Sequence, residues 1–394
     1  MKKMKNVDNV SISKNRISSN IVKLGFVSFF TDTSTDMIYP LLPLFLRQLG
    51  AGSILIGLIE GLAESSSSIF KVFSGWLSDR IRKRKILVVI GYSISSVIKP
   101  LFGFSRNVID VLFLRFTERI GKGIRTAPRD AIIAESSLKE SRGRAFGFHR
   151  GMDTLGAVAG PILAFLLLPL FKYNYRAIFF ISVIPAAIAV LLIFFVKEGK
   201  KIKEKTTREL SFSGYGKTFI FFIIIIGFFS LANSSNAFLI LRAQDVGVKP
   251  LFIPLLWGFF NIVYALVSFP GGILSDKIGR KAVIITGMIL YALVYFGFAT
   301  VLLPSHVWFL FFFYGVYYGI TECNLRAFIV DLSPEEKKAT AIGIYHTTVG
   351  VIVFPASLLM GILWRYINPA FAFGFCGTIA FISAFLLFFV KGER

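Results

Sequence analysis

A run of charged residues interrupts the apolar sequence between residues 115 and 129, where the chain reads RFTERIGKGIRTAPR. If this segment is helical, its ionisable side chains share a sector of about 120°. They are Arg115, Glu118, Arg119, Lys122, Arg125 and Arg129. Each such charge costs ~2.5–3.5 kcal/mol to place in hydrocarbon, so we expect the stripe to face protein or a wet cavity. Guanidinium groups bind carboxylates through two parallel hydrogen bonds, so the stripe predicts a site for an anionic solute.

The members of the stripe divide by position. The four from Arg115 to Lys122 favour contact with the solute or a role in coupling. For Arg125 and Arg129 we favour a structural role in a cytoplasmic gate, through pairing with nearby acids. The candidate acids are Asp79, Asp130 and Glu135.

Carboxylates on two other segments could carry protons. Asp32 and Asp36 lie one helical turn apart, and Glu64 lies in the next apolar segment. Burial favours the protonated form of a carboxyl group while a nearby arginine favours the ionised form, so a balanced group can exchange protons. Static pairing with the cationic stripe is an equally good interpretation. We also expect Lys71 to pair with Glu64, and Lys99 to extend to the membrane surface.

The elements that hold these residues are predicted to be membrane-spanning helices. The chain has 394 residues, of which 55% are hydrophobic and 17% charged, with 44 Phe, and its mean hydropathy is +0.70. Apolar runs of about 20 residues, enough to cross ~30 Å of hydrocarbon, recur along the whole length. The sequence predicts an all-α membrane protein with twelve transmembrane helices. We place them near residues 18–46, 54–77, 86–104, 107–134, 143–170, 176–196, 217–242, 250–275, 282–303, 305–331, 338–364 and 369–390.

The net charge of +22 is unevenly distributed. Lys and Arg gather in the segments that would share one side of the membrane, such as Arg80–Lys85 and Lys197–Lys217. This distribution is typical of cytoplasmic loops, so we expect both termini in the cytoplasm. Basic loops of this kind favour anionic lipid as the neighbour, and they argue against nucleic-acid binding.

An internal repeat divides the chain. SGWLSDRIRKRKI at 74–86 is matched by GGILSDKIGRKAV at 271–283, and RDAIIAESS at 129–137 by LRAFIVDLS 196 residues later. We predict two pseudo-symmetric six-helix bundles, 18–196 and 217–394. A cytoplasmic tail, 1–17, precedes them, and a charged linker, 197–216, joins them.

The repeated loop resembles a signature of the major facilitator superfamily, Gly-x-x-x-Asp-Arg/Lys-x-Gly-Arg-Arg/Lys. The second copy fits fully, through Gly272, Asp276, Lys277, Gly279, Arg280 and Lys281. The first copy keeps Gly75, Asp79 and Arg80 but has Arg82 where the second glycine is expected. The resemblance covers the whole chain and implies that the first and fourth helices of each bundle line a central cavity. An aspartate at a helix end could accept a hydrogen bond or pair with an arginine, which predicts a cytoplasmic gate that opens when the bundles rock.

Glycines in the fifth predicted helix resemble the antiporter motif of the same superfamily. The matching residues are Gly147, Gly156, Gly160 and Pro161, although Ala164 and Phe165 replace its last two glycines. Small residues allow two helices to approach closely, and a proline bends a helix. The match favours export by exchange, and generic helix packing is the alternative.

The second half carries fewer charges and more neutral polar groups. We expect Asn233, Asn236, Glu322 and Arg326 to complete a solute site at the interface of the halves. Asparagines also serve as interhelical hydrogen-bonding groups, which is the alternative for each of them.

The sequence lacks the nucleophile–base pairs, phosphate loops and metal-ligand spacings that an enzyme would need, and it predicts neither a cofactor nor a metal. We predict a monomeric secondary active transporter of the cell membrane that works by alternating access. Proton-coupled efflux of a small organic anion or amphiphile is the first interpretation. A proton-coupled importer of an anionic metabolite or metal chelate is the alternative, and a transporter-like receptor or sensor is a more remote one.

Overall fold

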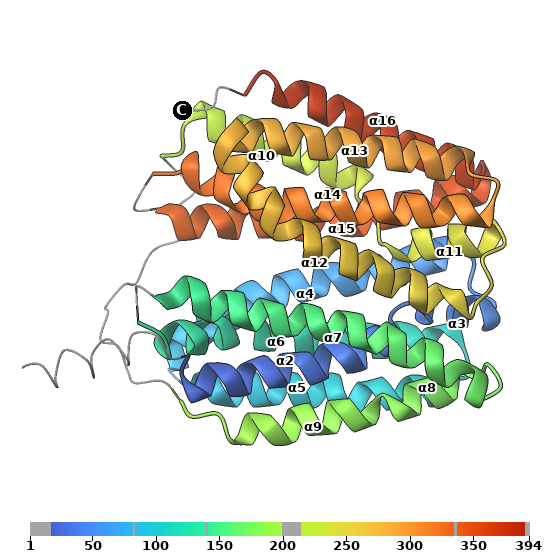
Figure 1. Cartoon of the computed structure of the whole chain (residues 1–394), viewed down its shortest axis with the longest axis horizontal. Coiled ribbons are helices and arrows are strands. Elements are labelled where there is room, and N and C mark those ends of the chain that lie inside the picture. The colour runs from blue at the N-terminus through green and yellow to red at the C-terminus, as the bar shows by residue number, and fades with distance from the viewer. Residues whose placement is uncertain (1–16, 82, 139–140, 199–213, 335–336, 391–394) are drawn as a thin grey trace, which may run out of the picture.

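The computed structural model describes residues 17–81, 83–138, 141–198, 214–334 and 337–390. Most of the predicted tail, 1–17, and of the predicted linker, 197–216, lies outside these residues. The described chain is helical and contains no strand, and its long helices lie side by side (Figure 1). The first residues of α2 and the last residues of α16 lie at the same end of the molecule.

The helices make twelve passes. In chain order these are α2 (Ser19–Ile38) with α3 (Leu42–Gln48), α4 (Ser53–Ile81), α5 (Arg84–Leu101) with η1 (Phe102–Phe104), α6 (Val108–Glu135), α7 (Arg142–Leu170), α8 (Tyr175–Ile181) with α9 (Val183–Phe194), α10 (Lys217–Ala232) with α11 (Ala237–Asp245), α12 (Phe252–Ile278), α13 (Arg280–Thr300), α14 (Pro304–Asp331), α15 (Lys338–Tyr366) and α16 (Pro369–Leu387). Within the described residues, nine helices have the length and apolar composition to cross a membrane. The passes outside this set are polar or charged α2 and α6 and tyrosine-rich α14.

Three passes predicted as continuous helices are broken: the sixth turns at Ser182, between α8 and α9, and the first and seventh are broken at matching positions. In the first pass α2 ends at Ile38, just before Pro40, whose ring cannot continue the hydrogen-bond ladder. In the seventh, α10 ends at Ala232 and the polar run Asn233–Asn236 separates it from α11. Asn and Ser side chains compete with the backbone for hydrogen bonds, which disfavours helix at this point. The prediction of unbroken helices at 18–46, 176–196 and 217–242 was therefore wrong.

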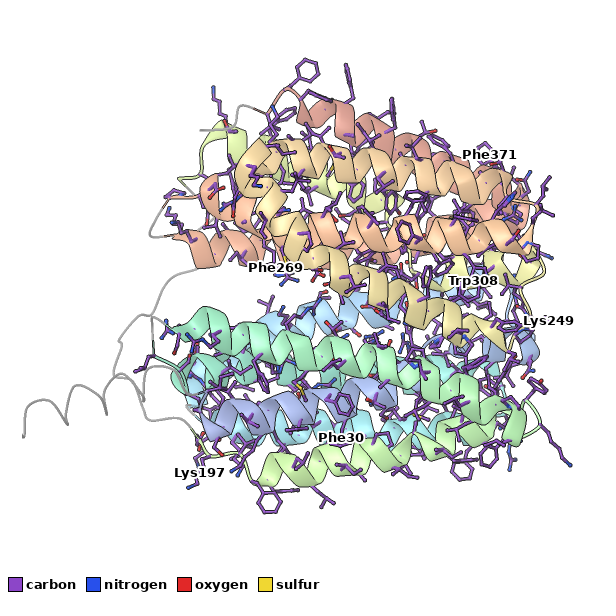
Figure 2. The ribbon with its side chains drawn as sticks, in the orientation of Figure 1. Phe30, Lys197, Lys249, Phe269, Trp308 and Phe371 are labelled. Carbon is purple, nitrogen blue, oxygen red and sulfur yellow. The ribbon has the colours of Figure 1, made fainter. Side chains whose placement is uncertain are left out.

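Helices α2–α9 form one half and α10–α16 the other (Figure 1). We call the end that carries the loops after α4 and α12 the inner end, because those basic loops predict a cytoplasmic location. Lys197 lies at this end and Lys249 at the outer end (Figure 2). Large apolar side chains such as Leu302 and Phe104 are exposed, as expected for surfaces in contact with lipid.

The apolar core is continuous between the halves only towards the outer end. One cluster of buried side chains runs through the second half and includes outer residues of the first half, such as Phe45 and Phe179. A separate cluster, with Leu24 and Tyr92 among its members, fills the inner part of the first half alone. The halves are therefore packed together at the outer end in this conformation.

Polar contacts along α4 and α15 join the halves at close range. Ser53 donates to the carbonyl oxygen of Gly361 at 2.9 Å, and Ser65 to that of Gly350 at 2.6 Å. A Cβ atom on Gly57 would lie 2.3 Å from the carbonyl oxygen of Ser357. On the opposite flank, Asn261 of α12 donates to the carbonyl oxygen of Ala157 of α7 at 3.2 Å. We call this set of contacts the outer seam.

Local features fix the charged helix α6 in place. Asn107 and Asp110 form a capping box at its outer end, with Asp110 N–H donating to the Asn107 side chain at 2.9 Å. A Cβ atom on Gly123 would lie 2.7 Å from the carbonyl oxygen of Ser67 in α4, and one on Gly121 would lie 2.8 Å from that of Gly91 in α5. Helix α6 is thus held tightly between α4 and α5.

Candidate functional site

The outer part of the α6 stripe is buried in an ion-pair network with α4. Arg115 donates through Nε and Nη2 to the two oxygens of Glu60, each at 3.0 Å, and through Nη1 to Glu118 at 3.2 Å. Arg115 is 2% exposed, and the two glutamates are each 1% exposed. The network satisfies the charge of Arg115 inside the protein, so a solute could reach this guanidinium only by disrupting it.

The next turn of α6 lies at the edge of this network. Arg119 pairs with Glu64 at 2.7 Å and with Glu118 at 3.5 Å, while the Glu64 side chain remains 35% exposed. Lys122, one turn further inward, is half-buried. Solute contact for the members from Arg115 to Lys122 stays a prediction, and Arg115, Glu118 and Arg119 are largely covered by protein in this conformation. Among the charged residues that α4 and α6 bring together, Glu64 and Lys122 are more accessible to solvent.

Two predicted lysine positions were wrong. Lys99 does not extend to the membrane surface; it is 1% exposed, and its Nζ donates to the carbonyl oxygen of Thr31 at 3.1 Å. The face of α5 that carries Lys99 packs against the acidic helix α2, which gives the ammonium group a polar partner. Lys71 does not pair with Glu64, which pairs with Arg119 instead at 2.7 Å.

The predicted proton-carrying aspartates, Asp32 and Asp36, lie on α2 in the first half. Asp36 accepts a hydrogen bond at 3.0 Å from the indole nitrogen of Trp257, which belongs to the second half. The Trp257 ring also contacts Tyr39, with 4.9 Å between ring centroids. Asp32 is half-buried, and the charges of Lys122 and Arg125 act on it. The carboxyl group of Asp36 is thus hydrogen-bonded directly to the second half.

The charged layer of the first half is balanced when all its acids are ionised, with Asp153, which also acts on Asp32, counted with its neighbours Arg129 and His149 instead. Its carboxylates are Asp32, Asp36, Glu60, Glu64 and Glu118. Its cations are Lys99, Arg115, Arg119, Lys122 and Arg125. Protonation of any one carboxylate would leave an excess positive charge in a medium of low dielectric.

Two of the three glycines predicted in α7 pack against α2. A Cβ atom on Gly156 would lie 2.4 Å from the carbonyl oxygen of Phe29, and one on Gly160 would lie 2.4 Å from that of Thr33. Pro161 follows directly within the same helix. A Cβ atom on Gly147, near the inner end, would meet no atom within 4 Å, so its role in close packing stays a prediction about a conformation closed at that end.

The repeated loops make matching ion pairs at the inner end. Arg84 pairs with Glu135, and Arg280 pairs with Asp331, at positions 196 residues apart. Arg84 also pairs with Asp79 at 3.1 Å. Lys85 and Lys281 cap the last helix of each half, donating to the carbonyl oxygens of Phe194 and Phe388, each at 2.8 Å. The basic residues of the motif therefore tie each half to itself.

These contacts change the assignment within the first loop. Arg84 occupies the place of Arg280, where the spacing of the signature would put Lys83, because the first loop has one more residue between Asp79 and this arginine. Arg80 is exposed and contacts the Trp76 ring at 5.4 Å. The offset of 196 in the rest of the repeat, against 197 for the aspartates, was the signal for this.

The predicted gate residues do not form a latch between the halves here. The Asp79 side chain is 76% exposed and pairs within its own half, and Asp276 is exposed. A Cβ atom on Gly75 would make only ordinary contact, and one on Gly272 would meet no atom within 4 Å. A gating role for these residues stays a prediction about a conformation closed at the inner end.

The last two arginines of the stripe make structural contacts. Arg125 donates to Ser95 Oγ at 2.7 Å and lies 4.5 Å from the centroid of the Tyr92 ring. Arg129 pairs at 2.9 Å with Asp130 of the same helix, one of the partners considered from the sequence, and donates to Ser28 Oγ of α2 at 3.4 Å. Both side chains therefore connect α6 to its neighbours within the first half.

The predicted polar residues of the second half fall in two places. Asn236, at the break before α11, accepts a hydrogen bond from Tyr314 at 2.6 Å, and Asn233 lies half-buried in the same break. Glu322 and Arg326 lie one turn apart on α14 and pair at 2.5 Å. Among the described residues, the structure keeps these two pairs apart, one at the break before α11 and the other on α14.

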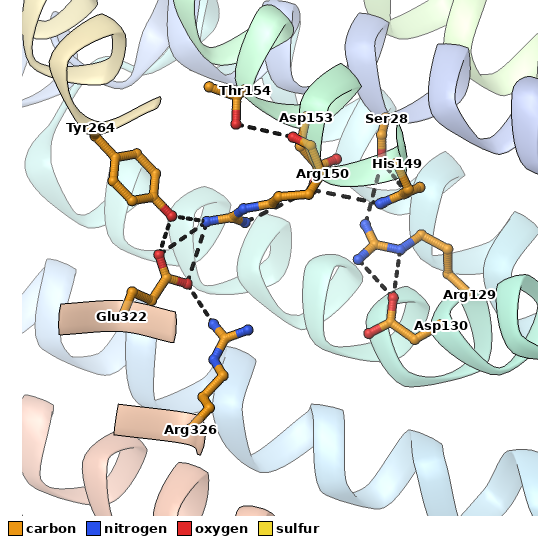
Figure 3. Close-up of polar contacts among 10 residues, drawn as sticks. All are labelled: Ser28, Arg129, Asp130, His149, Arg150, Asp153, Thr154, Tyr264, Glu322 and Arg326. Atoms are coloured by element: carbon orange, nitrogen blue, oxygen red, sulfur yellow. Dashed lines mark hydrogen bonds and ion pairs between the residues drawn. The ribbon is translucent and has the colours of Figure 1, made fainter. Parts of the chain in front are cut away.

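Arg150 of α7 joins the halves and was missed as a functional residue. It pairs with Glu322 at 3.1 Å and hydrogen-bonds to Tyr264 of α12 (Figure 3). An arginine in the middle of an apolar helix was the available signal in the sequence. Its partners could not be read from the sequence, because they belong to the other half.

Arg84 and Arg80 allow a direct test of the reassigned loop. We expect Arg84→Gln to lower thermal stability more than Arg80→Gln, by about 1 kcal/mol or less because the site is partly exposed. Arg84 bridges Asp79 and Glu135, whereas Arg80 only stacks on Trp76. Thermal unfolding of the two purified variants measures the difference. Equal losses would contradict the assignment.

The sequence matches a family model and several curated proteins. The model described as Major Facilitator Superfamily matches residues 24–232 and 218–394. An uncharacterized MFS-type transporter of Methanocaldococcus jannaschii is 42% identical over 381 residues, covering 95% of each chain. A multi-drug resistance efflux pump of Streptococcus pneumoniae is 26% identical, covering 79% of this chain and 80% of that one. The cis,cis-muconate transport protein of Acinetobacter baylyi is 22% identical, covering 93% and 95%.

Solved structures share the fold at lower identity. A nucleoside transporter superposes with a TM-score of 0.80 at 13% identity, covering 94% of this chain and 99% of that one. This likeness and the family match confirm the predicted all-α membrane fold and the family resemblance of the loop motifs. The chain belongs to the Major Facilitator Superfamily and is a membrane transporter of small solutes, not an enzyme.

Proposed function

We propose that this protein is a secondary active transporter that carries a small organic anion together with protons by alternating access. The balanced charged layer of the first half is the observation that supports this proposal. Protonation of Asp32, Asp36 or Glu64 would leave cations uncompensated, and a bound anion would restore neutrality. Proton and anion therefore stabilise the same state, which is the requirement for cotransport.

Alternating access is supported by the distribution of contacts between the halves. The apolar core and the outer seam hold the halves together at the outer end. Opening to the outside would separate α4 from α15 and α7 from α12, and the broken helices α2–α3 and α10–α11 lie beside this region. We place the protein in the cell membrane as a monomer, with its basic loops in the cytoplasm.

Proton-coupled efflux by exchange is the second candidate, and one observation favours it. Gly156, Gly160 and Pro161 resemble the antiporter motif, the two glycines pack closely on α2, and one relative is described as a multi-drug resistance efflux pump. Tight packing of α7 on α2 also serves a cotransporter, whereas shared stabilisation by proton and anion disfavours exchange. The relative described as a muconate transport protein is in accord with an anionic solute.

Proteoliposomes with an imposed pH gradient separate the two candidates. With the inner end facing the lumen and acid outside, we expect labelled carboxylates from a solute panel to accumulate and a protonophore to abolish the accumulation. The matching amides, which lack the charge, should not accumulate. Extrusion of the carboxylates under the same gradient would reject cotransport in favour of exchange. Absence of flux and counterflow for every anion would reject an anionic solute.

A further inference from the structure

We propose that Arg150 and Arg326 bind the carboxylate group of the solute at the interface of the halves, and that Glu322 occupies the position of that group in the empty protein. This inference rests on the proposed anion transport. It assigns the solute to the class of planar carboxylates and adds a binding site on α7 and α14 to the charged layer of the first half.

The contacts of Glu322 describe what a solute carboxylate would find there (Figure 3). Arg150 Nη2 donates to both oxygens, at 3.1 and 3.3 Å, and Arg326 Nη2 donates to Oε1 at 2.5 Å. The Tyr264 hydroxyl donates to Oε2. Donors from α7, α12 and α14 thus converge on one carboxylate, with the charge-assisted geometry that guanidinium groups offer to any carboxylate.

The charges at this position favour a second anion. Arg150 and Arg326 share the single carboxylate of Glu322, and the other acid near Arg150, Asp153, lies 4.0 Å away. Of the nearby charges, Lys71 is offset most strongly by Asp130, and Asp153 by Arg129. Two guanidinium groups on the one carboxylate of Glu322 therefore leave positive charge uncompensated.

Exposure allows a solute to compete for these arginines. The side chains of Arg150 and Arg326 are 53% and 48% exposed, whereas that of Glu322 is 24% exposed. A solute can therefore approach the guanidinium groups without unfolding the helices. Glu322 lies on the same helix turn as Arg326, so a rotation of its side chain is enough to vacate the position.

Aromatic rings next to the carboxylate define the rest of the site. Tyr264 stacks with Phe260 at 6.3 Å between centroids with 10° between the ring planes, and Tyr318 meets Tyr264 edge-on at 6.0 Å. Flat apolar faces beside paired arginines suit a planar group that carries a carboxylate. Benzoate is the simplest probe of this class, and benzamide is its neutral counterpart.

Displacement of Glu322 requires a proton and no other reactant. When the solute carboxylate takes both arginines, Glu322 loses its cationic partners and binds one proton to become a neutral carboxylic acid. The groups that face Glu322 are Arg150 of α7, Tyr264 of α12, Arg326 and Tyr318 of α14, and Tyr345 and His346 of α15. Anion and proton therefore enter together, one for one at this position.

Benzoate binding to the purified full chain, measured by calorimetry at acidic and alkaline pH, tests this site. We expect binding to wild type to strengthen as pH falls. Benzoate binding to Glu322→Gln should depend less on pH than binding to wild type, and it should be tighter than wild type at alkaline pH. Arg150→Gln and Arg326→Gln should each weaken binding about 10-fold or more. Benzamide should not bind, and Arg365→Gln, on the outer surface, should leave binding unchanged.

Several outcomes would overturn the inference. They are unchanged binding in Arg150→Gln, the wild-type pH dependence in Glu322→Gln, and absence of benzoate binding to Glu322→Gln, where both arginines are free. If Arg150→Gln does not fold, Arg150→Lys retains the charge without the fork, and it should bind benzoate more weakly than wild type. Binding in detergent does not depend on flux, so failure of the liposome experiment alone would reject the proposed function and leave this site standing.

Discussion

Replacing Arg115 with methionine is expected to destabilise the folded protein by about 3–5 kcal/mol, because two buried glutamates lose their cationic partner. Glu60 would keep no ion-pair partner from this network, and Glu118 would retain only Arg119 at 3.5 Å. Native domains are stable by only about 5–15 kcal/mol, so the loss is a large share of the total. Transport should disappear together with the folded protein.

Size-exclusion and thermal-unfolding profiles of the detergent-extracted variant measure this effect. Arg106→Met, just before the same helix in an exposed position, is the matched control and should behave as wild type. The double variant Arg115→Met with Glu60→Gln removes both charges and should recover much of the lost stability. A stable single variant would show that Glu60 and Glu118 are not held as buried carboxylates.

A methyl group on Gly57 is expected to open the outer end of the protein. The new Cβ would lie 2.3 Å from the carbonyl oxygen of Ser357, a main-chain atom that cannot rotate away. Overpacking of this kind costs about 1–3 kcal/mol. Since the contact exists only while α4 and α15 are together, Gly57→Ala should raise the ratio of outward-open to outward-closed protein about 5- to 150-fold.

Spin-label distances across the outer end detect this shift. Gln48 and Lys249 are exposed at the outer ends of opposite halves, and Cys323 is replaced by serine so that it takes no label. In this background, the distance between labels at Gln48 and Lys249 should be longer in Gly57→Ala than in the parent protein. Gly52→Ala is the matched control, because no atom lies within 4 Å of its Cβ. Gly156→Ala should lower stability without moving the labels, because its contact with Phe29 lies within one half. An unchanged distance in Gly57→Ala would contradict the claim that the closed outer end cannot accommodate a methyl group at Gly57.

The sequence was sufficient for the helices and for the repeat, because both leave local signals. Apolar length predicts a membrane pass, and the 196-residue offset predicts matching pairs such as Arg84–Glu135 and Arg280–Asp331. The charged face of α6 was also visible, since helical period alone places Arg115 and Arg119 together. Breaks in the first and seventh passes were missed because apolar residues on both sides of Pro40 and of Asn233 gave each pass the length of one spanning helix.

The partners of the charged residues could not be predicted from the sequence. Which acid meets Arg119, or whether Lys99 turns inward, depends on the rotation of α5 and α6 against α4 and α2. Close packing at Gly121 and Gly123 sets this rotation. The hydrophobic periodicity of the sequence does not predict it. The partner of Arg150 could not be predicted for a similar reason, because Glu322 lies in the other half and contacts Arg150 only when the halves assemble.

The chemistry of the outer seam has a consequence for how the carrier responds to its surroundings. Serine hydroxyls and an asparagine amide meet main-chain carbonyl oxygens there, and such neutral bonds contribute about 0.5–1.5 kcal/mol each. Dissolved ions screen charges and leave neutral dipoles almost untouched, so the exposed Arg47–Asp245 pair is the main electrolyte-sensitive contact at this end. The stability of the closed outer end should therefore hold nearly constant between dilute and concentrated brines.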